Sequence, residues 1–234
     1  MRTANAPDPR AAALKLRVLS AARRHRVPAR KQRGALTVLL AAGAAAAMFG
    51  MYFLWGGPAN AAGRPAPIVA WLLIGTLGLA VGATWFALPA RHSMLARNGG
   101  QLVAVALGVP LLIGGWIGLW HSAYLDPFQR FGWRCALLTA ATAPWPFAVL
   151  AWVSRRVQPV NPQLTGAALG GAAGAWAALV VQIWCPLSVA DHVLVGHVSP
   201  LLLLAGLGAA LGDRLFRMER IEDSPGVRLE RLPL

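Results

Sequence analysis

The composition of the chain excludes an ordinary soluble domain. Of its 234 residues, 57% are hydrophobic and only 13% are charged, and the mean hydropathy is +0.54. Soluble globular domains carry about 25% charged residues, so we expect an integral membrane protein. Most of the net charge of +14 lies in the first 34 residues. We assign this charge to anionic lipid headgroups, which attract each membrane-proximal Lys or Arg by roughly 1 kcal/mol, and we expect no direct nucleic-acid partner.

The first segment, residues 1–34, is a basic head with one amphipathic stretch. Residues 11–26 can form a short helix with three apolar side chains near one face and basic residues around them. Such a helix is too short to bury a core alone, so it either lies on the membrane surface or orders on a partner. The predicted partner-binding residues are Leu14, Arg17, Val18, Leu19, Arg23 and Arg24.

Six apolar blocks of membrane-spanning length follow the head. A bilayer core about 30 Å thick is crossed by about 20 apolar residues in a helix. The blocks are residues 35–55, 68–88, 102–120, 135–153, 164–184 and 193–211. The fourth is the weakest, because Pro144 and Pro146 lie inside it. The predicted fold is therefore all-α, a polytopic membrane bundle of about six helices over residues 35–212, with a tail at 213–234.

The distribution of basic residues predicts the orientation of this bundle. With six spans, nineteen Lys and Arg residues fall on one side of the membrane and three on the other. The positive-inside rule places the richer side in the cytoplasm, so we expect both termini to be cytoplasmic. An odd number of spans would place the basic head and the basic tail on opposite sides.

Glycines recur at four-residue spacing within several predicted spans. The fifth span carries Gly166, Gly170 and Gly174, and the pairs Gly78/Gly82, Gly114/Gly118 and Gly208/Gly212 repeat the pattern. Small residues at this spacing let helix backbones approach closely inside lipid. We expect these ridges to pack helices of one chain against one another.

The predicted topology places the scarce reactive side chains together on the outer side. Cys135 begins the fourth span, Cys185 follows the fifth, and His121, His192 and His197 lie at the same level. Three interpretations stay open: a disulfide, which suits an oxidising periplasm; a transient soft-metal site of thiolates and imidazoles; or plain packing at helix ends. The sequence has no CxxC, HExxH or Gly-rich phosphate loop, so we expect no enzyme and no resident cofactor.

Several short motifs between residues 133 and 215 resemble those of one bacterial family. They are Cys135, Pro144-Trp145-Pro146, Asn161-Pro162, Trp184-Cys185-Pro186, Asp191-His192, Gly196-His197 and the glycines 208–212. Together with the basic leader before the first span, they resemble the NrsF-type multi-pass anti-sigma factors. In size and span count the chain is also similar to CarR-like anti-sigma factors.

This resemblance implies a function without catalysis. The protein would lie in the bacterial inner membrane. Its cytoplasmic segment would hold an extracytoplasmic-function sigma factor at that membrane, and a signal reaching the membrane portion would release it in a stress response. Cys135 and Cys185 would match the family's paired cysteines, which are linked to metal or oxidative sensing. The alternative is a small membrane transporter or metal-handling protein that uses the same outer Cys and His residues.

Overall fold

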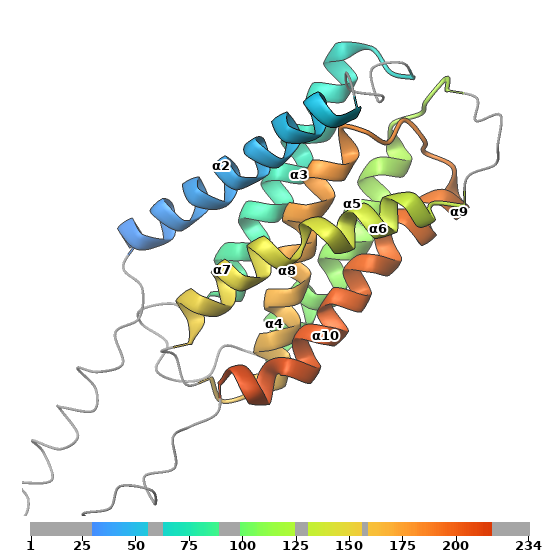
Figure 1. Ribbon diagram of the computed structural model, residues 1–234. Coiled ribbons are helices and arrows are strands. Elements are labelled where there is room, and N and C mark those ends of the chain that lie inside the picture. Colours follow the sequence, from blue (N-terminus) through green and yellow to red (C-terminus); the bar gives the residue numbers. More distant parts are fainter. Residues whose placement is uncertain (1–29, 56–62, 89–98, 125–130, 156–158, 217–234) are drawn as a thin grey trace, which may run out of the picture.

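The computed structural model describes residues 30–55, 63–88, 99–124, 131–155 and 159–216 (Figure 1). Within these ranges the protein is all helical and contains no strand. The predicted all-α class is therefore confirmed. The amphipathic stretch of the head, with its six predicted partner-binding residues, lies outside the described residues, and so does the tail beyond 216.

Among the described residues, six helical segments are long and apolar enough to cross a membrane, as the sequence predicted. The first two are single helices, α2 (Arg30–Trp55) and α3 (Ala66–Ala87). The third consists of α4 (Gly99–Val103), a π-helical turn η2 (Ala104–Gly108) and α5 (Val109–Leu119). The fourth consists of α6 (Trp133–Thr142) and α7 (Pro144–Ser154), and the fifth is α8 (Pro162–Gln182). The sixth consists of α9 (Ala190–Val193), the π-helical turn η3 (Leu194–Val198) and α10 (Ser199–Leu215).

The two prolines of the fourth span interrupt the helix only slightly. Pro144 is the first residue of α7, a position where the missing N–H needs no helical partner. The backbone N–H of Ala143 still donates to the carbonyl of Thr139, and that of Phe147 donates to the carbonyl of Ala143. The chain therefore continues in one direction through α6 and α7, and the weakest predicted span is present.

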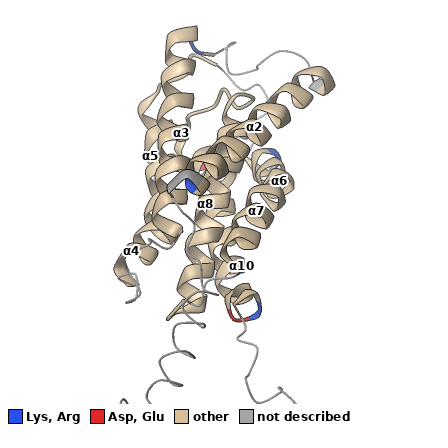
Figure 2. Ribbon diagram, turned by 90° about the vertical axis from the view of Figure 1, so that its left-hand side faces the viewer, with Lys and Arg blue, Asp and Glu red and all other residues tan. Residues whose placement is uncertain are grey.

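Helix α8 forms the centre of the bundle (Figures 1 and 2). Of the residues in its most apolar stretch, 94% are buried. Its glycines at 166, 170 and 174 face α10 across a very short separation. A Cβ on Gly166 or Gly170 would overlap a backbone carbonyl of α10. The prediction of packing within one chain is confirmed for this pair of helices, whereas a Cβ at Gly78 or Gly82 would meet no atom of the described residues within 4 Å.

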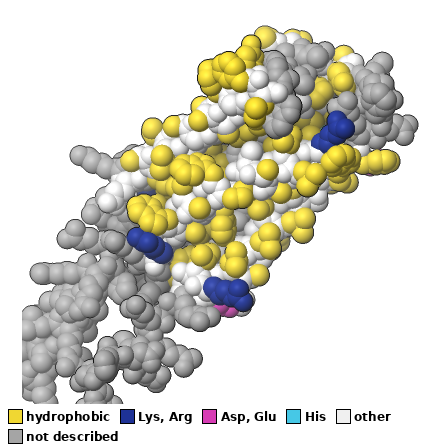
Figure 3. Space-filling view, in the orientation of Figure 1, with side chains coloured by type: hydrophobic (Ala, Val, Ile, Leu, Met, Phe, Trp, Pro, Cys, Tyr) yellow, Lys and Arg dark blue, Asp and Glu magenta, His cyan; other side chains and the backbone are white. Residues whose placement is uncertain are grey.

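Two buried hydrogen bonds join α8 to α3. The indole Nε1 of Trp176 donates to Oγ1 of Thr84 at 2.9 Å, and Oγ1 of Thr76 donates to Oε1 of Gln182 at 2.8 Å. Outside this core the surface is apolar, with basic side chains toward the two ends of the visible face (Figure 3). An apolar belt between charged ends is the surface that a bilayer requires. Which end faces the cytoplasm stays a prediction.

Candidate functional site

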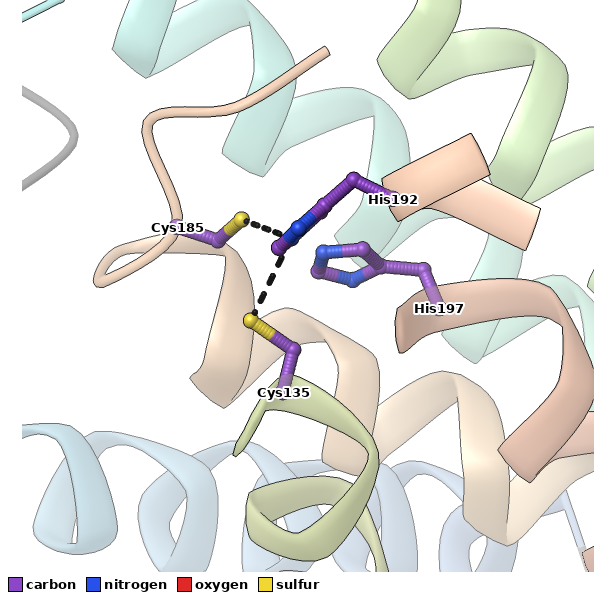
Figure 4. A group of neighbouring side chains, drawn as sticks. All are labelled: Cys135, Cys185, His192 and His197. Carbon is purple, nitrogen blue, oxygen red and sulfur yellow. Dashed lines mark hydrogen bonds between the residues drawn. The ribbon is translucent and has the colours of Figure 1, made fainter. Parts of the chain in front are cut away.

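Four reactive side chains meet at one end of the bundle (Figure 4). Cys135 comes from α6, Cys185 from the segment after α8, His192 from α9 and His197 from η3. One potential ligand atom from each residue lies within 4.8 Å of the other three. Three of the four residues are buried, and Cys135 is half-buried. We call this group the Cys–His cluster.

His192 lies between the two sulfur atoms. Its Nε2 is 3.1 Å from Sγ of Cys185 and 3.5 Å from Sγ of Cys135, and its ring centroid is 5.7 Å from that of His197. The two sulfurs are not joined by a disulfide, and neither forms one with another described residue. Around a tetrahedral metal with bonds of about 2.0–2.3 Å, donor atoms stand about 3.3–3.8 Å apart. The two separations from His192 are therefore already close to those of such a site, and the other pairs of donor atoms lie within 4.8 Å.

Two glycines allow Cys135 to reach the histidine-bearing segment. Gly132, which precedes α6, has a φ of +85°, a left-handed conformation that favours glycine. A Cβ there would lie 2.7 Å from the backbone N of Gly196 and the carbonyl oxygen of His192. A Cβ on Gly196 would in turn lie 3.2 Å from that of Cys135. The first turn of α6 thus lies directly against η3.

The π-helical turn η3 explains how two histidines five residues apart serve one site. In a regular α-helix each residue turns the direction of the side chain by roughly 100°, so His192 and His197 would point about 140° apart. A π-turn is wider, with hydrogen bonds from i to i+5, and brings such residues toward the same side. The rings of His192 and His197 consequently lie beside each other at an interplanar angle of 49°.

His197 is the most unusual member of the cluster. Its side chain is 0% exposed, and neither ring nitrogen has a hydrogen-bond partner among the described residues. A buried polar group without a partner costs about 1–3 kcal/mol. Nearby, the thiol of Cys135 lowers the pKa of Cys185 well below its ordinary value, and the neighbouring imidazoles act in the same direction, although burial opposes them. The site therefore favours a thiolate at Cys185, flanked by the imidazoles of His192 and His197.

Comparison with known proteins identifies the family. Residues 19–218 match the family described as negative regulator of sigma F, NrsF. This chain belongs to the NrsF family. It is 30% identical over 161 residues to the probable anti-sigma-F factor NrsF of Azospira oryzae, across 63% of this chain and 71% of that protein. No solved structure matches the chain.

Family membership confirms the resemblance drawn from the motifs. The family's description indicates a regulatory role, the negative regulation of a sigma factor, and so favours that role over transport or catalysis. It also means that the Cys–His cluster belongs to a regulator.

The structure brings together four of the five residues that the sequence predicted to lie on the outer side. Cys135, Cys185, His192 and His197 form the cluster, whereas His121 is exposed and lies outside it. His121 follows α5 and is not among the four residues whose ligand atoms lie within 4.8 Å of one another. Its place in the sequence, at the outer level, therefore predicted the correct end of the bundle but not membership of the group.

Sequence reasoning missed Arg64, which precedes α3 and is 3% exposed. Its Nη1 donates to the carbonyl of Cys185 at 3.3 Å, and its Nε and Nη2 donate to the carbonyl of Trp120 at 3.2 and 3.1 Å. One sequence signal could have identified it. Arg64 is the single basic residue between the first two spans, on the side of the membrane that carries only three.

Proposed function

We propose that this protein is an inner-membrane anti-sigma factor that binds an extracytoplasmic-function sigma factor on its cytoplasmic side and releases it on a signal received at the Cys–His cluster. Membership of the NrsF family supports the regulatory part of this proposal. The asymmetry of basic residues supports a cytoplasmic head and a periplasmic cluster. Sequestration requires only tight and exclusive binding, so the mechanism needs no catalytic residue.

The signal that best suits the cluster is a soft or borderline transition-metal ion. The observation that carries this assignment is His197, a fully buried imidazole without a partner among the described residues, close to three other ligating atoms. A disulfide would use the two sulfurs and leave both imidazoles unchanged. A metal ion would engage all four side chains, and two thiolates with two imidazoles form a donor set that selects zinc, copper and similar ions.

Binding at the cluster would draw three spans together. Cys135 is carried by α6, Cys185 follows α8 directly, and the histidines belong to the start of the sixth span. Contraction around an ion, from separations of up to 4.8 Å toward about 3.5 Å, would shift these helix ends relative to one another. We propose that this shift changes the cytoplasmic surface that holds the sigma factor. The two sites are coupled only if both bias the same two-state element.

Affinity purification from native membranes tests the partner. The intact chain should retain a sigma factor in stoichiometric amount, and deletion of residues 2–29, which leaves α2 whole from Arg30, should abolish retention. Deletion of residues 217–234 serves as the matched control and should retain it. Absence of any sigma factor at good yield would refute the anti-sigma proposal and lead to flux assays for the transport alternative.

Substitution of the cysteines tests the sensor. The Cys135→Ser/Cys185→Ser double variant should repress the sigma-dependent promoter as well as the parent protein but should no longer respond to an inducing metal. His121→Ala, outside the cluster, should respond normally. An intact response in the double variant would show that the signal is received elsewhere.

A further inference from the structure

Arg64 is buried at the same end of the bundle as the Cys–His cluster. Only 3% of its surface is exposed, although arginine is seldom buried unless its guanidinium is engaged. All three of its nitrogens donate to backbone carbonyls, Nη1 to Cys185 and the other two to Trp120. Burial lowers the pKa of Arg64, while the negative charge available at Cys185 raises it. Geometry and charge thus both relate this side chain to Cys185.

The residue before Arg64 holds the same corner in place. The backbone N–H of Ala123 donates to the carbonyl of Gly63 at 3.1 Å. A Cβ on Gly63 would collide with Ser122 and Tyr124 and would also press on Pro186, the residue after Cys185. The segment at 63–64 is therefore wedged between the chain leaving α5 and the chain leaving α8. It has contacts with both, and one of them carries a cluster thiol.

We propose that Arg64 is a positioning residue of the Cys–His cluster. By donating to the carbonyls of both Cys185 and Trp120, it holds the backbone of Cys185 in place and so keeps the thiol of Cys185 next to His192. The guanidinium is suited to this role because its planar fork presents several donors in fixed directions. Cys185 lies beyond the end of α8. Its backbone N–H still donates to the carbonyl of Val181 at 3.2 Å, whereas its own carbonyl accepts from Arg64. Arg64 adds a second constraint on Cys185, from a distant part of the chain.

The expected change in metal affinity rests on the proposed sensing function. Its magnitude is taken from other metal sites. Groups that orient a ligand without touching the ion commonly change metal affinity by about 10–100-fold when they are removed. Arg64→Gln keeps donors but loses the charge and the fork. Arg64→Lys keeps the charge but has a single ammonium, which cannot span both carbonyls in the same geometry.

The experiment uses the full chain purified in mild detergent, with Arg134→Gln as the matched control. Arg134 is exposed at the same end of the bundle and packs on Trp133, 5.4 Å from its ring, rather than on the cluster. Two quantities are measured for each variant. One is the affinity for Cd²⁺, followed by thiolate-to-metal absorbance, and the other is the rate at which N-ethylmaleimide alkylates Cys185 relative to Cys135, followed by peptide mass spectrometry.

We expect Arg64→Gln to weaken Cd²⁺ binding by about 10-fold or more and to raise the relative alkylation of Cys185, which is only 5% exposed in the intact site. Arg64→Lys should change both quantities in the same direction, and Arg134→Gln should change neither. A lowered melting temperature with unchanged affinity and unchanged alkylation ratio would overturn the proposal and make Arg64 a residue of the fold alone. If the parent protein binds no Cd²⁺, the metal-sensing function fails, and the alkylation ratio still decides the role of Arg64.

Discussion

Replacing His197 by Leu should stabilise the metal-free protein while it destroys the metal site. The neutral imidazole carries one donor and one acceptor, and both nitrogens are buried without partners among the described residues. Each such group costs about 1–3 kcal/mol, so an apolar side chain of similar size should stabilise the metal-free fold by about 2 kcal/mol or more. For a chain of this length that corresponds to a rise in melting temperature of roughly 4 °C or more.

The effect on metal binding has the opposite sign. Structural zinc sites with four ligands gain about 10–16 kcal/mol, or roughly 2.5–4 kcal/mol for each ligand. Loss of His197 should therefore weaken binding by about 100- to 1,000-fold, at 1.4 kcal/mol for each factor of ten. His121→Leu is the control, because His121 is exposed and outside the cluster. It should leave the affinity unchanged.

Thermal unfolding in detergent with a chelator, and zinc titration of the same preparations, measure the two effects. The combination of a higher melting temperature and a lost site is specific to a buried ligand that has no other partner. A melting temperature that falls or stays constant in His197→Leu would refute the reasoning, since the imidazole would then already be satisfied in the metal-free protein. An unchanged affinity would remove His197 from the ligand set.

Two further predictions concern packing and protonation. Gly170→Ala should destabilise the bundle by about 1–3 kcal/mol, because its Cβ would overlap a backbone carbonyl of α10. The matched change Gly82→Ala, in open space, should be neutral or stabilising, and equal melting temperatures would contradict this packing. Because the pKa of Cys185 is lowered, first of all by Cys135, alkylation of Cys185 should persist at pH values well below the ordinary thiol pKa of about 8.5. Cys135→Ala should move that profile to higher pH, and an unmoved profile would show that the cause lies elsewhere.

The spans were predictable because hydrophobic length is a local property. Each apolar block needed only to be counted against the thickness of a bilayer, and all six are present. The sequence could not show that Pro144 would become the first residue of a new helix rather than a break. Nor could it distinguish the glycines of α8 that pack against α10 from Gly78 and Gly82, where an added Cβ would meet no described atom within 4 Å. That difference depends on which helices become neighbours.

The cluster was predictable only in part, for a related reason. Charge asymmetry and an even number of spans place both cysteines and three histidines at one level, but level alone does not select ligands. His121 and His197 are equivalent in that respect, yet one is exposed and the other is fully buried. The choice between them depends on the side to which each backbone turns, and no count of apolar residues reveals it.

The feature that makes the choice is the π-helical turn at Leu194–Val198. A regular α-helix would direct His192 and His197 about 140° apart, so the cluster would keep at most one of them. The close approach of Gly132 to Gly196 then places Cys135 against this same turn. Wide turns of this kind are rare and recur at functional sites. They change the direction of the side chains that follow relative to a regular α-helix. In this protein the irregular turn aligns two imidazoles, and the ligand set therefore depends on η3 remaining a π-helix.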